Sequence, residues 1–209
     1  MSIQNELKSR SITDQKINII AVSKTFSIDS IKPLIDHGHL HYGENKVQEA
    51  IEKWSQIKEN KKNLILHMIG KLQTNKVKFV VPLFDYIHSL DNIKLAKKIS
   101  SEQKKINRNL KIFIQVNIGD ENQKNGIAKD QIADFYKKCV DEFNLDIIGL
   151  MCIPPVDGNM KMYFSEMNTL NKNLGLKQLS MGMSSDYLKA IECGATFVRI
   201  GSKIFGNRL

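Results

Sequence analysis

The sequence predicts an α/β fold in which eight parallel strands alternate with helices to form a closed (β/α)8 barrel. Short apolar runs recur along the chain, and each is followed by a polar or glycine-containing turn and then by a stretch with helical spacing. Strands joined through helices are parallel, and eight such units in 209 residues match a small barrel. An open, doubly wound sheet is the alternative fold, because sequence fixes the ends of elements only to within a few residues.

The first strand is predicted at residues 17–22, a nearly continuous apolar run typical of a strand buried on both faces. Lys24 follows directly after its end. A helix is predicted over residues 27–36, with Ser27 or Asp29 as its N-cap and a glycine just beyond its last turn. These residues make up the first strand-helix unit.

Five more strands are expected before the C-terminal segment, at residues 39–42, 64–69, 86–90, 112–117 and 147–151. The helices between them are expected around Val47 to Trp54 and at residues 75–81, 93–106, 130–143 and 160–174. No linker or low-complexity segment separates these units. We therefore expect one domain over residues 1–209.

The C-terminal segment contains the last two strands, at residues 179–181 and 196–200, with a short helix at 187–192 between them. Each strand is followed by a serine- and glycine-containing turn, at Ser184 and at Gly201-Ser202. In a parallel barrel both turns lie at the same edge, where unpaired backbone N–H groups at helix starts bind anions. Barrels of this type usually hold phosphate at the loops after strands seven and eight, so we predict a phosphate site here.

The composition is that of a soluble globular protein, with 42% hydrophobic and 25% charged residues. The net charge of +9 raises the question of nucleic-acid binding, but only four of the 31 basic residues are arginine and the lysines are spread along predicted helices. We find no recognition helix or aromatic RNA platform. Solvated helix faces explain the charge better than a nucleic-acid partner.

No apolar run reaches the length of a membrane span, and the first residues contain no apolar segment of signal type. We therefore expect a cytoplasmic protein with no membrane partner. Cys139, Cys152 and Cys193 have no spacing typical of a disulfide framework or zinc site. A monomer is the default expectation for a closed barrel.

Lys24 is the candidate for covalent chemistry. A lysine directly after a buried strand projects from the barrel rim, where loss of hydration lowers the pKa of its amine. A neutral amine can form a Schiff base with an aldehyde. The alternative is a lysine that simply reaches solvent.

Arg199 lies inside an apolar strand of a chain that strongly prefers lysine, which indicates a role that lysine cannot fill. Its guanidinium has only donors and can hold an aromatic nitrogen unprotonated. The alternative is an ion pair with Asp186 or Glu192. A phosphate site, an amine and an arginine together match pyridoxal 5'-phosphate (PLP), which has a phosphate, an aldehyde and a ring nitrogen.

Five segments carry a resemblance to a known family: AVSKT at 21–25, YGENKVQE at 42–49, HMIGKLQTNK at 67–76, SMGMSSDYLKAI at 180–191 and VRIGSKIFGNR at 198–208. They closely resemble the pyridoxal phosphate homeostasis protein family. The resemblance implies a barrel like the N-terminal domain of alanine racemase (PLP fold type III) that carries PLP. It also implies a role in PLP homeostasis and amino-acid balance without established catalytic turnover, with PLP-dependent apoenzymes as possible recipients.

By position, the resemblance assigns six cofactor-binding residues: Lys24, Asn45, Ser184, Arg199, Gly201 and Ser202. The lysine would hold the aldehyde and the arginine would face the pyridine nitrogen. The Ser184 side chain and the backbone of the last two residues would bind the phosphate, and Asn45 would lie near the lysine. Position 202 is more usually threonine in the family. The segment before the first strand is short, and this puts in doubt whether the family's long first helix is complete here.

Three other functions are weighed against a cofactor carrier. A racemase-like enzyme needs a second base and a second domain, whereas the sequence offers one candidate lysine and no convincing partner acid. A metal-dependent hydrolase is suggested by the histidines at 37, 39, 41, 67 and 88, but the first three lie at the wrong end of their strand and no carboxylates complete a site. The last alternative is a barrel that binds another phosphorylated metabolite and uses Lys24 only as a charge. We expect a carrier without catalytic residues.

Overall fold

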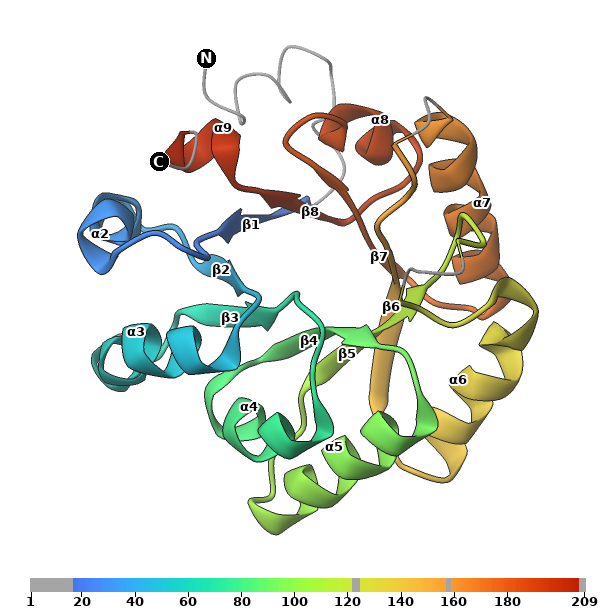
Figure 1. Ribbon diagram of the computed structural model, residues 1–209, viewed down its shortest axis with the longest axis horizontal. Helices are drawn as coiled ribbons and strands as arrows, with labels where there is room; N and C mark the ends of the chain where they lie inside the picture. Colours follow the sequence, from blue (N-terminus) through green and yellow to red (C-terminus); the bar gives the residue numbers. More distant parts are fainter. Residues whose placement is uncertain (1–16, 122–124, 157–158, 207–209) are drawn as a thin grey trace.

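Eight parallel strands close into a barrel in the computed structural model (Figure 1). The structure describes residues 17–121, 125–156 and 159–206. The strands are β1 (Asn18–Val22), β2 (His41–Glu44), β3 (Ile65–Met68), β4 (Tyr86–Leu90), β5 (Lys111–Val116), β6 (Asp146–Cys152), β7 (Gln178–Met183) and β8 (Phe197–Ile200). Each strand pairs with the next, and β8 pairs with β1 over residues 18–21. This closing pair confirms the barrel and rules out the open sheet.

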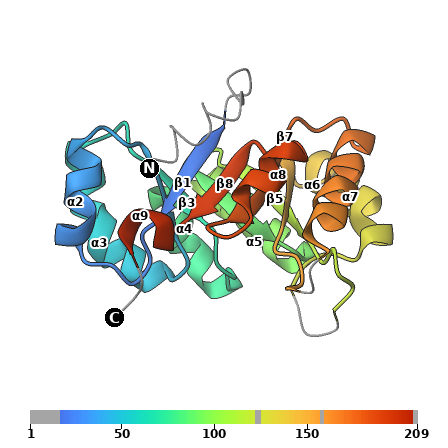
Figure 2. The same cartoon turned by 90° about the horizontal axis from the view of Figure 1, so that it is seen from above.

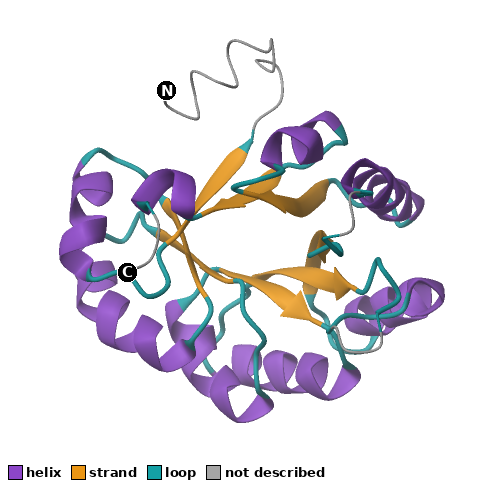
Figure 3. Ribbon diagram, turned by 45° about the horizontal axis from the view of Figure 1, so that its top comes forward, coloured by secondary structure: helices purple, strands orange, loops and turns teal. Residues whose placement is uncertain are grey.

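The helices lie outside the strands and surround them (Figure 3). They are α2 (Ile28–Asp36), α3 (Val47–Asn60), α4 (Val77–Leu83), α5 (Ile93–Lys105), α6 (Ile132–Asp141), α7 (Met160–Asn173), α8 (Tyr187–Glu192) and α9 (Ser202–Phe205), with 3-10 turns at Thr74–Lys76 and Lys129–Gln131. Seen from above, α2 and α3 flank the strands on one side and α6 and α7 on the other (Figure 2). No helix in the described part of the chain is long and apolar enough to cross a membrane.

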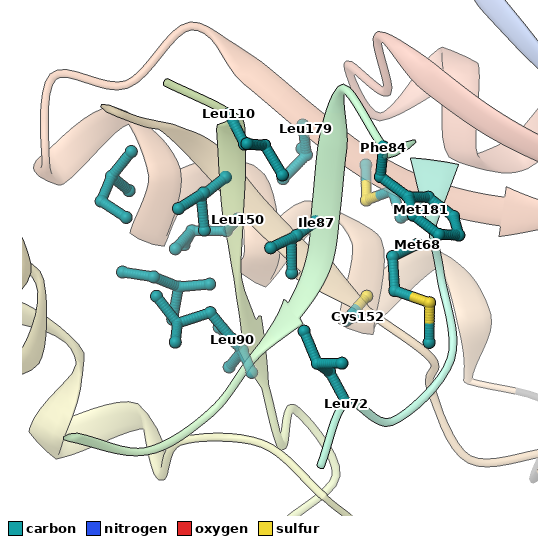
Figure 4. Close-up of a cluster of buried hydrophobic side chains, with 14 of the residues drawn as sticks. Met68, Leu72, Phe84, Ile87, Leu90, Leu110, Leu150, Cys152, Leu179 and Met181 are labelled. Carbon is teal, nitrogen blue, oxygen red and sulfur yellow. The ribbon is translucent and has the colours of Figure 1, made fainter. Parts of the chain in front are cut away.

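The apolar core has two layers. The larger one lies between the strands and the helices and contains Met68, Phe84 and Leu150, all fully buried (Figure 4). The smaller one fills the barrel interior around Phe113 and Phe197. Burying a side chain of this size contributes about 1.5–3 kcal/mol relative to leaving it exposed. The strands are therefore buried on both faces, which is why several of them read as nearly continuous apolar runs in the sequence.

The second strand differs most from its prediction, since it runs from His41 to Glu44 instead of over residues 39–42. Gly38 has a φ of +91° after the end of α2, and the two residues that follow it stay in a loop. Gly43 lies inside the strand because its neighbour leaves no room: an added Cβ would lie 2.8 Å from a methyl group of Ile20. The strand therefore continues to Glu44, whose carboxylate is buried in the fold.

Most other elements begin and end within two residues of their predicted positions. Ser27 caps α2, accepting a hydrogen bond from the Ser30 N–H group, as one of the two predicted caps. Helix α4 starts two residues later than expected and contains Pro82, and α9 was not predicted as a helix. The expectation about the segment before the first strand concerns residues 1–16, which lie outside the described part of the chain.

Candidate functional site

A cavity of about 760 Å³ lies at the carboxyl ends of the strands. All six residues predicted from the sequence line it: Lys24, Asn45, Ser184, Arg199, Gly201 and Ser202. They come from the ends of β1, β2, β7 and β8, which are far apart in the sequence but adjacent in the closed barrel. The barrel therefore brings the predicted residues together at the face where barrels of this type place their chemistry.

The loops after β7 and β8 lie side by side in the cavity wall, at the same edge of the barrel, as predicted. The backbone N–H of Gly201 donates a hydrogen bond to the Ser184 hydroxyl oxygen over 3.2 Å. The turn after β7 is fixed by Asp186, whose carboxylate accepts from the Met183 N–H over 2.6 Å. Gly182 has a φ of +91°, and an added Cβ would lie 2.6 Å from the Ala190 methyl group of α8. These contacts hold a hydroxyl and the N–H groups at the start of α9 close together.

Arg199 projects from β8 at the base of this cavity and is only 5% exposed. Its Nη1 donates to the Ser180 hydroxyl oxygen over 2.8 Å, and its Nη2 donates to the Cys152 carbonyl over 2.9 Å. Burial lowers the pKa of the guanidinium from its ordinary value. Because that ordinary value is very high, the group still stays charged. Among the described residues no carboxylate forms an ion pair with Arg199. The alternative of a pair with Asp186 or Glu192 is therefore wrong.

The loop that carries Lys24 is held on both sides of that residue. On one side, the Ser23 hydroxyl donates to the Glu44 carboxylate over 2.8 Å. On the other side, the Thr25 N–H donates to the Glu49 carboxylate over 2.5 Å. Thr25 has a φ of +70°, a left-handed conformation that β-branched residues rarely adopt and that costs roughly 1–2 kcal/mol. The bond from Glu49 helps to hold this unusual turn, and with it the position of Lys24.

Lys53 of α3 joins these contacts. Its ammonium donates three hydrogen bonds, to the Ser23 carbonyl over 2.9 Å, to Glu44 over 3.0 Å and to Glu49 over 2.9 Å. The Glu44 side chain has no exposed surface and that of Lys53 only 8%. Glu44 also accepts from the Trp54 indole N–H over 2.9 Å. A buried ion-pair network therefore links α3 to the end of β1, next to the cavity.

Asn45 contributes an amide to the cavity wall. Its Oδ1 is buried and has no hydrogen-bond partner among the described residues. Gly70 lies against the Asn45 backbone, where an added Cβ would be 2.4 Å from the carbonyl oxygen. A buried acceptor without a partner is costly in a folded protein. Asn45 is therefore placed to accept a hydrogen bond from a bound molecule.

The charge of the cavity wall is positive. Lys24, Lys71, Arg199 and Lys203 line it, whereas none of its described lining residues is aspartate or glutamate. The Lys203 ammonium also lies 4.7 Å from the centre of the Tyr187 ring. A group of cations in one cavity wall attracts a multiply charged anion such as a phosphate ester.

Several lining residues were not predicted from the sequence. Gln115 of β5 is 9% exposed, and its side chain donates to the Asn125 carbonyl over 3.2 Å. It is the buried polar residue of the strand KIFIQV, so a polar residue inside an apolar run could have marked it, as it marked Arg199. Phe26 and Ile153 form an apolar part of the wall, and nothing in their spacing marked them in the sequence.

The histidines do not form a metal site. No group of three or more potential ligands that could hold a metal lies within the described residues. His37 is exposed at the end of α2, whereas His67 and His88 are fully buried inside the barrel. His88 lies within β4, as predicted for residues 86–90, and does not line the cavity. The metal-dependent alternative has no structural support in this part of the chain.

Comparisons with known proteins find relatives over nearly the whole chain. The family model described as the alanine racemase N-terminal domain matches residues 4–208. The pyridoxal phosphate homeostasis protein of Pasteurella multocida is 35% identical over 217 residues, covering 99% of this chain and 93% of that protein. The structure of PipY from Synechococcus elongatus with PLP bound has a TM-score of 0.86 and 31% identity, covering 97% of this chain and 99% of that one. Alanine racemase from Corynebacterium glutamicum, at 13% identity and a TM-score of 0.67 over 92% of this chain and 56% of its own, shares the fold alone.

Proposed function

Since the chain belongs to the pyridoxal phosphate homeostasis protein family, which has the fold of the alanine racemase N-terminal domain, we propose that it binds PLP and serves PLP homeostasis and amino-acid balance. The observation that carries this proposal is the cavity itself. It combines a lysine at a strand end with an arginine, a serine turn and two further lysines, and its described lining has no carboxylate. PLP is a phosphate ester with an aldehyde and a pyridine ring, and each of these groups has a suitable partner there.

The phosphate would bind between the loops after β7 and β8. The Ser184 hydroxyl supplies a donor, and the backbone N–H groups at the start of α9 have no acceptor within that helix. The Gly201 N–H donates to Ser184 in this structure, so a phosphate oxygen would take over that bond as both groups turn toward it. Lys203, at the same edge, adds positive charge.

Arg199 would face the pyridine nitrogen. A guanidinium has only donors, so the nitrogen must accept and stays unprotonated. The two hydrogen bonds to Ser180 and Cys152 fix the plane of the guanidinium before the cofactor arrives. The unpaired Oδ1 of Asn45 would accept a hydrogen bond from a donor on the cofactor.

Lys24 would hold the aldehyde carbon as a Schiff base. Its amine must lose a proton before it can attack the aldehyde carbon. The contacts that hold Ser23 and Thr25 set the direction in which the side chain leaves the β1 end. Bound PLP supplies an electrophilic carbon and an electron-withdrawing ring.

We further propose that the chain carries PLP without catalytic turnover. A racemase moves a proton to and from both faces of a substrate carbon, which requires two bases. Lys24 is one such base, but the described cavity lining contains no tyrosine, histidine, cysteine or carboxylate that could act as the second. An unprotonated pyridine ring also withdraws electrons weakly. PLP-dependent apoenzymes would be the recipients, and residues 1–209 would act as one cytoplasmic monomeric domain.

The test is a binding titration followed by two assays. PLP binding is measured for the wild-type protein and for Lys24→Ala, and the holoprotein is then incubated with alanine and other amino acids or with a PLP-dependent apoenzyme. We expect saturable binding that the variant weakens, activation of the apoenzyme, and no racemisation above the variant's level. Turnover at an ordinary enzyme rate that Lys24→Ala abolishes would favour the racemase-like alternative. If the wild-type protein does not bind PLP but binds another phosphorylated metabolite, the cavity is a site for that metabolite and the PLP proposal is wrong.

A further inference from the structure

A chain of hydrogen-bonded side chains crosses the interior of the barrel and ends at Arg199. We propose that this chain, formed by His41, His67, His88 and Ser180, positions Arg199 through neutral acceptors, so that the arginine keeps its full charge for the bound cofactor. The proposal rests on the proposed function for the identity of that cofactor. The four residues act through Arg199 and line no part of the cavity.

The chain is continuous. His41 Nδ1 lies 2.9 Å from His67 Nε2, and His67 Nδ1 lies 3.0 Å from His88 Nε2. His88 Nδ1 lies 2.9 Å from the Ser180 hydroxyl oxygen, which accepts from Arg199 over 2.8 Å. These side chains come from β2, β3, β4, β7 and β8. The last four residues are buried to 5% exposure or less.

Arg199 and the single hydroxyl proton of Ser180 together set the direction of the bonds in this chain. A guanidinium can only donate, so the Ser180 oxygen accepts from Arg199. Among the described residues, the only other hydrogen-bond partner of the Ser180 hydroxyl is His88 Nδ1, so we assign the Ser180 proton to that bond, with His88 Nδ1 as its acceptor. His88 therefore carries its proton on Nε2 and donates it to His67 Nδ1. By the same step His67 donates from Nε2 to His41, so both buried imidazoles share one tautomer.

Both buried imidazoles are neutral. Burial lowers the pKa of His67 and of His88 well below the ordinary histidine value, and the nearby charge of Arg199 acts in the same direction on His88. His67 stacks on Tyr86 and His88 stacks on Phe113, each with ring centres 4.4 Å apart, so aromatic rings cover both imidazoles. The hydrogen-bond pattern already requires an unprotonated Nδ1 on each ring, which a charged imidazole does not have.

Neutral acceptors have a consequence that a carboxylate would not have. An ion pair would hold Arg199 equally well but would cancel most of its charge at the cavity. Ser180 and the Cys152 carbonyl hold the guanidinium through neutral acceptors, and the Asp186 carboxylate acts on it only through space, without an ion pair. Because Ser180 itself donates to His88, its oxygen becomes a better acceptor for Arg199. The chain thus holds in place a cation that forms no ion pair among the described residues and that would face the cofactor's ring nitrogen.

Two measurements on the protein without cofactor test the chain itself. In protein labelled with 15N-histidine, NMR correlations through two bonds report which ring nitrogen carries the proton. We expect His67 and His88 to be neutral with the proton on Nε2 at pH 7. A proton on Nδ1 of either residue would reverse the chain and overturn the proposal. In protein labelled with 15N-arginine, we expect separate, slowly exchanging Nη signals for Arg199, assigned by their loss in Arg199→Gln.

Variants then test whether the chain acts through Arg199. Ser180→Ala and His88→Leu should merge the slowly exchanging Arg199 signals and shift the absorption band of bound PLP in the direction produced by Arg199→Gln. Ser180→Thr keeps the hydroxyl and should restore both signals. Met151→Leu, a buried change of similar volume in the barrel interior, is the matched control and should leave both unchanged. Folding of each variant is checked by its far-ultraviolet circular dichroism.

The outcomes separate this proposal from the proposed function. If Ser180→Ala folds and leaves both the Arg199 signals and the absorption band as in the wild type, the positioning role is refuted. If Met151→Leu produces the same changes as Ser180→Ala, the effect is general loosening of the interior and the proposal also fails. If the wild-type protein does not bind PLP, the proposed function fails, while the histidine and arginine spectra still decide whether the chain fixes Arg199.

Discussion

Replacing Lys53 by methionine should destabilise the protein more than the same replacement of an exposed lysine. Within the described residues, Lys53 is the only basic residue that forms an ion pair with Glu44. Methionine keeps most of the length and apolar volume of the side chain and removes the ammonium. The Glu44 carboxylate, which has no exposed surface, would then be left buried with hydrogen bonds from Ser23 and Trp54 alone.

The expected magnitude follows from that burial. Removing one partner of a buried ion pair costs about 3–5 kcal/mol, because the remaining charge is uncompensated. In a domain of this size each kcal/mol lowers the melting temperature by about 2–4 °C, so Tm should fall by roughly 6–20 °C. An exposed pair would contribute only about 0–1 kcal/mol, so the two cases are well separated.

The assay is thermal and urea unfolding followed by circular dichroism. Lys97→Met, an exposed change on α5, is the control and should stay within about 0.5 kcal/mol of the wild type. The double variant Lys53→Met with Glu44→Gln should recover part of the loss, since it removes the buried charge. A Lys53→Met variant no less stable than Lys97→Met would refute the reasoning, and so would a double variant less stable than Lys53→Met alone.

Three further predictions concern other parts of the fold and site. Gly182→Ala should lower the free energy of unfolding by about 2–4 kcal/mol in urea titrations, because alanine is strained at a φ of +91° and its methyl group would meet Ala190; a change below about 0.5 kcal/mol would contradict the close packing. Ser184→Ala should weaken PLP binding by about 1–2 kcal/mol, roughly 5- to 30-fold, through loss of one hydrogen bond to a charged group, and unchanged affinity would place the phosphate elsewhere. The free energy of unfolding should fall as the pH is lowered below about 6.5, because the lowered pKa values of His67 and His88 keep them neutral in the folded state while the unfolded chain takes up protons. Each residue adds at most about 1.4 kcal/mol per pH unit to this slope, and a slope that is the same in His88→Leu would contradict it.

The predicted residues that line the cavity share a local signal. Lys24 and Ser184 follow directly after apolar runs, so their place at the barrel rim depends only on where a strand ends. Arg199 was recognised because an arginine inside an apolar strand is unusual in a chain that prefers lysine. Such signals need no knowledge of which segments meet in space.

The contacts that the sequence did not reveal depend on the register of the closed barrel. Lys53 and Glu44 are nine residues apart, but among so many lysines nothing marked this one as buried. His41, His67 and His88 were interpreted as possible metal ligands. Their alignment across β2, β3 and β4 depends on the register of strand pairing, which places His67 beside Gly43 and Tyr86. The sequence does not show this register. Ser180 had no distinguishing feature at all, although its partners lie 92 residues before it and 19 after it.

The most direct test of the central claim, that Lys24 holds PLP, is an absorption spectrum of the purified protein with PLP before and after borohydride reduction, followed by peptide mass mapping. The account predicts a visible band that reduction removes and a phosphopyridoxyl group on the peptide that contains Lys24, with no such group in Lys24→Ala. A protein that stays colourless and unmodified, or one modified only at the exposed lysines, would contradict it.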